Sequence, residues 1–192
     1  MERTSTGVPN EKMLMWAFIG SECMLFGSLI ATYLAYRGRS IVGPYEEELL
    51  NIPFITVTTF VLLMSSLMMV LALSAVQRGD PRSKLFLLLT ALLGLVFLAG
   101  QVFEFNHFVH EGLGLGQNLF SGTFFLTTGF HGAHVTVGVI WLLTLWAMAM
   151  RGRLGPEKSL KVEVAGLYWH FVDVVWIVLF TVIYLMSGAS GA

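Results

Sequence analysis

Five long apolar segments constrain the fold of this chain more than any other feature. A helix needs about 20 residues to cross roughly 30 Å of hydrocarbon, and each segment reaches or approaches that length. We therefore predict an all-α integral membrane protein, a bundle of five transmembrane helices. Nothing divides the sequence into two units, so residues 1–192 are expected to form a single membrane domain. The segments occupy residues 13–36, 54–76, 85–103, 122–150 and 164–186.

The composition indicates the same class of protein. Hydrophobic residues make up 56% of the chain and charged residues only 12%, whereas soluble domains are typically about 25% charged. A soluble domain of 192 residues could not bury this much apolar surface in one core. No basic run indicates a nucleic-acid partner. The single cysteine, Cys23, rules out a disulfide framework and a Cys-based zinc site within one chain.

The distribution of Lys and Arg predicts the orientation in the membrane, because cytoplasmic loops are enriched in these residues. With five spans, the N-terminus and the loops at 77–84 and 151–163 lie on one side, and Arg37 and Arg39 lie on the other. We therefore expect the N-terminus in the cytoplasm and the C-terminus outside. The first segment reads as a retained helix and not as a signal peptide. The cationic residues on the predicted cytoplasmic side are Arg3, Lys12, Arg78, Arg82, Lys84, Arg151, Arg153, Lys158 and Lys161.

Several ionisable residues fall at membrane depth, where such groups are costly and are usually paired or functional. From the helical rise, Glu22 and Asp173 lie roughly 14 Å from the cytoplasmic ends of their helices, and His131 about 15 Å from the outer end of its own. Gln101 and Glu104 are one turn apart near an outer end. We expect these groups to be neutral or hydrogen-bonded between helices, with Glu22 near His131 or Asp173. The candidate buried polar or structural residues are Glu22, Gln101, Glu104, His131, His134, His170 and Asp173.

A metal site is the first alternative for these groups. Glu104 and His107 have the Glu-x-x-His spacing found in di-iron bundles. Such a site needs a second Glu-x-x-His, but Leu25 stands three residues after Glu22. His107 and His110 are expected in a glycine-rich loop near the membrane surface. We therefore predict no catalytic, cofactor-binding or metal-binding residue in this chain, while an independent intramembrane metalloenzyme stays open as an alternative.

A proton carrier is the second alternative, because Glu22, Asp173, His131 and His134 are residue types of intramembrane relays. A complete path would need polar steps to both faces. The segment at 54–76 offers only Thr and Ser hydroxyls for this. A hydrogen-bond cluster that joins helices is therefore the simpler interpretation.

Motifs along most of the chain resemble one protein family. Ser21 begins a Ser-Glu-x-x-x-Phe motif, residues 62–66 read Leu-Leu-Met-Ser-Ser, and Gln101 begins Gln-x-x-Glu. The two most specific signatures are Thr-Gly-Phe-His-Gly-Ala-His-Val at 128–135 and Tyr-Trp-His-Phe-Val-Asp-Val-Val-Trp at 168–176. Over about residues 12–186 the chain resembles subunit III of the haem–copper terminal oxidases, the cytochrome c oxidase subunit 3 family. Many members have seven helices, and this chain resembles the five-helix bacterial form.

The resemblance implies a non-catalytic subunit of a proton-pumping oxidase that passes electrons from cytochrome c to dioxygen in aerobic respiration. It implies an enzyme complex in the bacterial cytoplasmic membrane, with haem and copper in partner subunits and none in this chain. Subunit I is the expected main contact and subunit II a further partner. In the family, subunit III holds phospholipid, supports proton uptake and protects the dioxygen-reducing site from inactivation.

Lipid contact is expected near the cytoplasmic face, where amphipathic and charged side chains meet head groups. The residues that we assign to it are Trp169, His170 and Glu163. The electron donor is chosen by other subunits, so a quinol oxidase stays open, as does an accessory protein of nitric oxide reductases.

Overall fold

The computed structural model describes residues 7–37, 52–110, 112 and 119–186. Within these ranges, five helices are long and apolar enough to cross a membrane, as predicted. The last helix begins after a short 3₁₀ turn and continues into a π-helical turn. The elements are α1 (Asn10–Tyr36), α3 (Ile52–Gln77), α4 (Ser83–His110), α5 (Leu119–Met150), η1 (Pro156–Lys158), α6 (Ser159–Leu179) and η2 (Phe180–Leu185).

The predicted boundary at residue 103 is wrong, because α4 continues to His110. Gln101, Glu104 and Phe108 are all buried, and their spacing of three and four residues places them on one helical face. The polar composition of this stretch suggested a loop, yet its polar side chains on that face point into the bundle. His107 and His110 therefore lie in the last helical turn, where both are exposed, and not in a loop.

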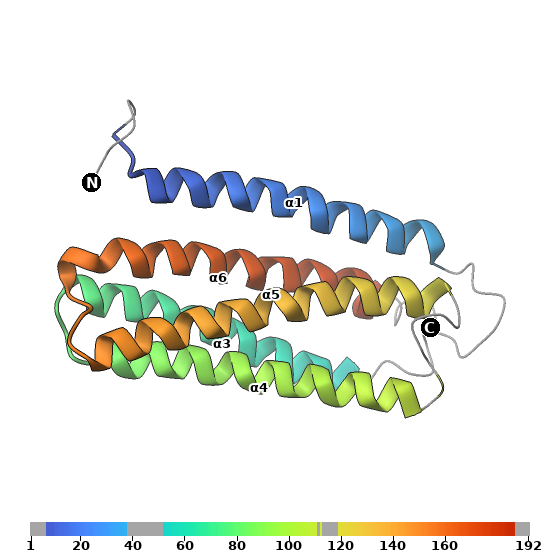
Figure 1. The fold of residues 1–192 in the computed structure, drawn as a ribbon. Coiled ribbons are helices and arrows are strands. Elements are labelled where there is room, and N and C mark those ends of the chain that lie inside the picture. The colour runs from blue at the N-terminus through green and yellow to red at the C-terminus, as the bar shows by residue number, and fades with distance from the viewer. Residues whose placement is uncertain (1–6, 38–51, 111, 113–118, 187–192) are drawn as a thin grey trace.

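The helices form a group of four with one helix outside it. In the group, α3 packs on α4 and α6, and α5 packs on α4 and α6. The outer helix, α1, packs on α5 and α6 and runs along the edge of the bundle (Figure 1). Its buried residues are only Met15, Phe26 and Tyr33. The first helix is thus the least embedded part of the described fold.

Trp169 packs at the centre of the four-helix group. Its indole lies between Gly94 of α4 and Gly138 of α5, where an added Cβ would meet the ring at 2.7 and 2.8 Å. The indole N–H donates to the hydroxyl of Ser65 on α3 at 3.0 Å. Small residues at an interface let backbones approach closely, which is the main source of helix association in lipid. One side chain of α6 therefore contacts three other helices.

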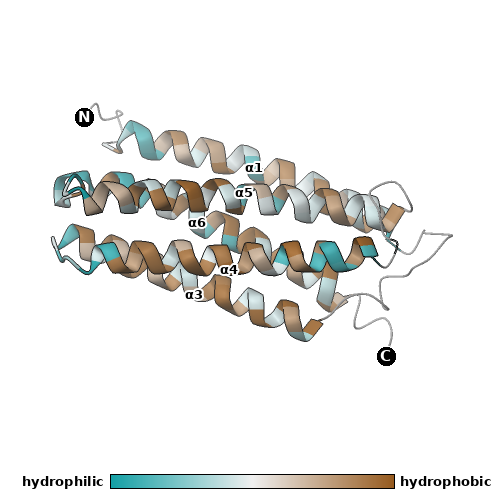
Figure 2. Ribbon diagram, turned by 60° about the horizontal axis from the view of Figure 1, so that its bottom comes forward, coloured by the Kyte–Doolittle hydropathy of each residue, from teal (hydrophilic) through white to brown (hydrophobic). Residues whose placement is uncertain are grey.

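The charged groups lie mainly at one end of the bundle. Figure 2 shows hydrophilic residues gathered where the start of α1, the α3–α4 turn and the α5–α6 connection meet. The structure therefore brings most of the described cationic residues to a common end, whereas Arg3 and Arg39 lie outside the described residues. The cationic residues at the start of α1 and in or next to the α3–α4 and α5–α6 connections are Lys12, Arg78, Arg82, Lys84, Arg151, Arg153, Lys158 and Lys161.

Candidate functional site in the buried polar groups

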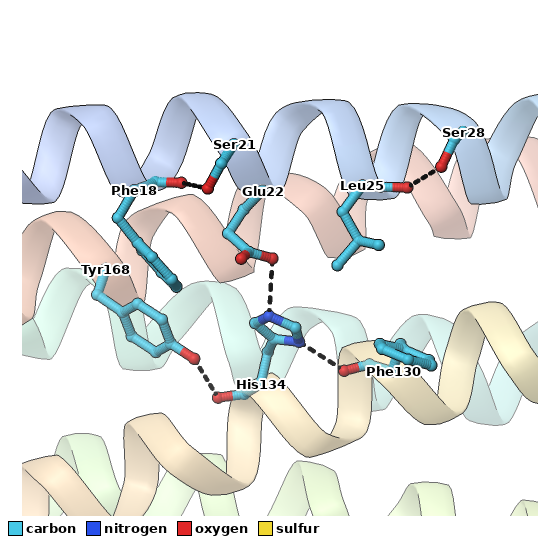
Figure 3. Close-up of polar contacts among 8 residues, drawn as sticks. All are labelled: Phe18, Ser21, Glu22, Leu25, Ser28, Phe130, His134 and Tyr168. Carbon is cyan, nitrogen blue, oxygen red and sulfur yellow. Dashed lines mark hydrogen bonds and ion pairs between the residues drawn. The ribbon is translucent and has the colours of Figure 1, made fainter.

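Glu22 of α1 contacts His134 of α5. The carboxyl Oε2 lies 3.0 Å from Nε2 of the imidazole, and the two side chains are 14% and 16% exposed (Figure 3). The other ring nitrogen, Nδ1, donates to the carbonyl of Phe130 at 2.7 Å. Because Nδ1 carries a hydrogen, the contact is either an imidazolium–carboxylate pair or a neutral imidazole that accepts from a neutral carboxyl. The partner of Glu22 is therefore His134, and not His131 or Asp173 as expected.

A tyrosine of α6 reinforces this junction. Tyr168 donates its hydroxyl to the carbonyl of His134 at 2.9 Å, so it ties α6 to the same turn of α5 (Figure 3). Phe18 of α1 packs its ring against Tyr168 with a centroid separation of 6.2 Å. Three helices thus meet around one residue of α5.

His131, one turn away on α5, is fully buried and has aromatic neighbours. Its ring stacks on Trp176 at 4.9 Å, while Phe97 and Phe26 approach edge-on at 5.9 and 6.4 Å. Neither ring nitrogen has a hydrogen-bond partner within the described part of the chain. The indole N–H of Trp176 donates to Thr59 of α3 at 2.9 Å. His131 therefore lies in an aromatic box made by α1, α4 and α6.

Gln101 and Glu104 join α4 to two different helices. Gln101 donates its amide to the carbonyl of Thr128 on α5 at 2.8 Å. Tyr184, in the π-helical turn η2, donates its hydroxyl to Oε2 of Glu104 at 2.9 Å. Oε1 of Glu104 has no partner among the residues described. The sequence prediction did not include Tyr184. Its place in an apolar segment could have indicated the contact, because a buried tyrosine hydroxyl usually has a polar partner.

His170 and Asp173 form a separate cluster between α6 and α3. The hydroxyl of Ser66 lies 3.0 Å from Nδ1 of His170, and Asp173 interacts with both residues. Asp173 is 5% exposed, and its Oδ1 has no partner in the ranges that the structure describes. The similar depth expected for Glu22 and Asp173 does not bring them together, because their side chains leave their helices toward different neighbours.

All three residues expected to contact lipid are engaged in contacts within the bundle. Trp169 is only 1% exposed, so the lipid assignment for it is wrong: Gly94 and Gly138 leave room for the indole inside the bundle. Glu163 pairs with Lys12 of α1 at 2.5 Å. The third, His170, is half-buried against Ser66.

The Glu-x-x-His spacing does not assemble a metal site. Glu104 faces the core, whereas His107 is exposed. Among the described residues, no group of three or more His, Cys, Asp or Glu side chains could hold a metal ion. What most of the polar residues do in this geometry is join helices through hydrogen bonds and ion pairs.

Comparison with known proteins decides the family. The model of the family described as "Cytochrome c oxidase subunit III" matches residues 7–188. This chain belongs to that family. Cytochrome c oxidase subunit 3 of Bacillus sp. (strain PS3) is 42% identical over 97% of this chain and 91% of its own length. Quinol oxidase subunit 3 of Bacillus subtilis is 38% identical over 90% and 85%. The ubiquinol oxidase subunit 3 of Pseudomonas aeruginosa is 35% identical over 90% and 83%.

The chain is thus subunit III of a haem–copper oxidase complex and a multi-pass membrane protein that associates with other oxidase subunits. The two signature motifs of this subunit III lie on adjoining helices, at 128–135 in α5 and 168–176 in α6. They supply both members of two contacts, His131 on Trp176 and Tyr168 on the carbonyl of His134. The residues that carry the family resemblance are therefore the ones that fasten α5 to α6.

Proposed function

We propose that this chain is the non-catalytic subunit III of a proton-pumping terminal oxidase that takes electrons from cytochrome c to dioxygen in a bacterial cytoplasmic membrane. One observation carries the proposal: most of the buried polar residues form hydrogen bonds between helices. These bonds join Glu22 to His134, Ser66 to His170 and Tyr184 to Glu104. Haem and copper in subunits I and II would supply the electron transfer and dioxygen reduction.

The charge distribution supports an orientation with the N-terminus in the cytoplasm. The basic end of the bundle contains the start of α1 and both even-numbered connections between spans, as the positive-inside rule requires of a cytoplasmic face. Glu163 pairs with Lys12 at this end, and the cluster of Ser66, His170 and Asp173 lies near the middle of α3 and α6. In this proposal, these groups support proton uptake by subunit I from the cytoplasmic side.

Two hollows, neither of them lined by Trp169, support the phospholipid role. A groove of about 460 Å³ runs between α1, α5 and α6, and its walls are apolar apart from His134 and Tyr168. A second hollow of about 370 Å³ lies at the basic end and includes Lys158, Lys161, Glu11 and Glu157. Trp141 lines both. An acyl chain in the groove and a head group among the charges would place an amphipathic Trp at their boundary.

Depletion of the subunit from the purified complex tests the supporting role. Electron transfer should run at first, but turnover should then fall progressively, and more so at high pH because protons are scarcer there. An immediate loss of the haem spectrum and of all activity would instead make the chain an assembly or cofactor-holding element. A complex whose rate and lifetime are unchanged by depletion at every pH would refute the supporting role.

A quinol donor is the second candidate, because relatives of similar identity bear the names of both oxidase types. Oxidation of reduced cytochrome c and of a quinol by the same purified complex distinguishes the two electron donors.

Metal analysis of the isolated chain tests the different-class alternative of an independent intramembrane metalloenzyme. Stoichiometric iron, copper or zinc that is lost on His131→Ala would favour that alternative.

A further inference from the structure

The attachment of α1 to the bundle is unusually dependent on a few contacts. Lipid chains are as apolar as leucine, so the hydrophobic effect does not hold one transmembrane helix on another. What remains is close packing and hydrogen bonds between helices. In α1 the buried residues are Met15, Phe26 and Tyr33. Near its middle, α1 contacts the bundle through the pair between Glu22 and His134, one turn from Phe26. Phe18 packs on Tyr168 of α6, and Lys12 pairs with Glu163 at the basic end.

Phe26 is the part of α1 that covers the aromatic box. Its ring lies 5.1 Å from the imidazole of His134 and 6.4 Å from that of His131, measured between ring centroids. It also meets Phe171 of α6 edge-on at 6.4 Å. The other walls of the box, Phe97 and Trp176, belong to α4 and α6. Displacement of α1 alone would therefore uncover His131.

Two opposing effects act on this cover. A buried imidazole whose nitrogens lack partners loses its hydrogen bonds to water, which disfavours the closed position of α1. The bond between Glu22 and His134 and the packing of Phe26 favour it. α1 is therefore a two-state element: this bond and this packing favour its closed position, and the unsatisfied imidazole disfavours it.

We propose that α1 is a lateral lid over His131, with the pair of Glu22 and His134 as its latch and Phe26 as its stopper. When the latch breaks, α1 moves away from α5, and small solutes that enter the membrane reach the imidazole of His131. The groove of about 460 Å³ lies beside the latch and is lined by His134, so the boundary that opens is already hollowed. The lid is a property of this subunit's fold and holds for either electron donor.

Acylation of histidine by diethyl pyrocarbonate in the intact purified complex measures the lid directly. Tandem mass spectrometry of the α5 peptide separates His131 from His134, and the exposed His107 and His110 serve as internal standards. In the wild type, His131 should react far more slowly than either standard. Glu22→Leu should raise the rate at His131 about three- to twentyfold, the range that corresponds to one hydrogen bond between membrane helices. Glu22→Gln, which keeps a hydrogen-bonding partner for His134, should stay within about twofold of the wild type.

Ser21→Ala is the matched control, because Ser21 is an exposed neighbour of Glu22 and bonds only the carbonyl of Phe18 in its own helix. An equal rise in this control, or no rise at His131 in an assembled Glu22→Leu complex, would overturn the proposal. If Glu22→Leu does not assemble, Phe26→Leu keeps the latch and thins the stopper, and it should also speed the reaction.

Discussion

Replacement of Gly138 by alanine should weaken the four-helix group at its tightest point. The new methyl carbon would lie 2.8 Å from the six-membered ring of Trp169 and 3.2 Å from the ring of Tyr168. Carbon atoms pack best at about 3.5–4.0 Å, so the indole and α5 must separate by about 0.7–1.2 Å. The indole has little room to retreat, because Gly94 of α4 leaves a notch of similar tightness on its other side.

The magnitude follows from two contributions. Overpacking of a well-filled core typically costs about 1–3 kcal/mol. A shifted indole also loses or lengthens its hydrogen bond to Ser65, now 3.0 Å, which is worth about 0.5–1.5 kcal/mol. We therefore expect Gly138→Ala to destabilise the subunit by about 2–4 kcal/mol.

The assay is the temperature at which this subunit dissociates or unfolds in the purified complex. Gly129→Ala is the control on the same helix, since nothing lies within 4 Å of the position of its Cβ. It should be neutral or stabilising by up to about 1 kcal/mol, the helix preference of alanine over glycine. Trp169→Phe in the Gly138→Ala background should recover part of the loss, because the smaller ring relieves the overlap. Equal midpoints for Gly138→Ala and Gly129→Ala would refute the packing argument.

Two further changes test the contacts between helices. Tyr184→Phe removes the donor to Glu104 and should lower stability by about 1–3 kcal/mol, because a buried acceptor loses its partner. Adding Glu104→Leu should recover part of this, and a double variant less stable than Tyr184→Phe alone would contradict the assignment. Lys12→Met breaks the pair with Glu163. Both side chains are about one-third exposed, so the stability of the subunit should fall by only about 0–1 kcal/mol, measured from the same dissociation midpoint. A loss as large as that of Gly138→Ala would show that the basic end of α1 carries more of the attachment than exposure suggests.

The prediction of spans and of family succeeded because both depend on properties of a linear segment. A run of apolar residues long enough for the hydrocarbon must cross it as a helix, whatever its neighbours are. The motif at 128–135 is likewise read along one helix. Depth is also a one-dimensional quantity, and the rise per residue placed Glu22, His131 and Asp173 in the interior of their spans.

The sequence did not show which residues Glu22, His131 and Asp173 contact. Glu22 was expected near His131 or Asp173, but it contacts His134, because residues of similar depth meet only if their side chains leave their helices toward each other. The end of α4 was placed too early for a related reason: the polar residues between 101 and 110 resemble a loop until their helical spacing is matched to a buried face.

The sequence by itself therefore determined the membrane class, the five spans, the family and the set of polar residues that must be accommodated. The tertiary structure decided what each of them contacts. Trp169 shows the difference most clearly: an amphipathic side chain near a helix end predicts a lipid interface, and two glycines on other helices turn it into the centre of the core. Rotation about the helix axis and the identity of the neighbouring helix are set by close packing between segments far apart in the chain, and no local pattern encodes them.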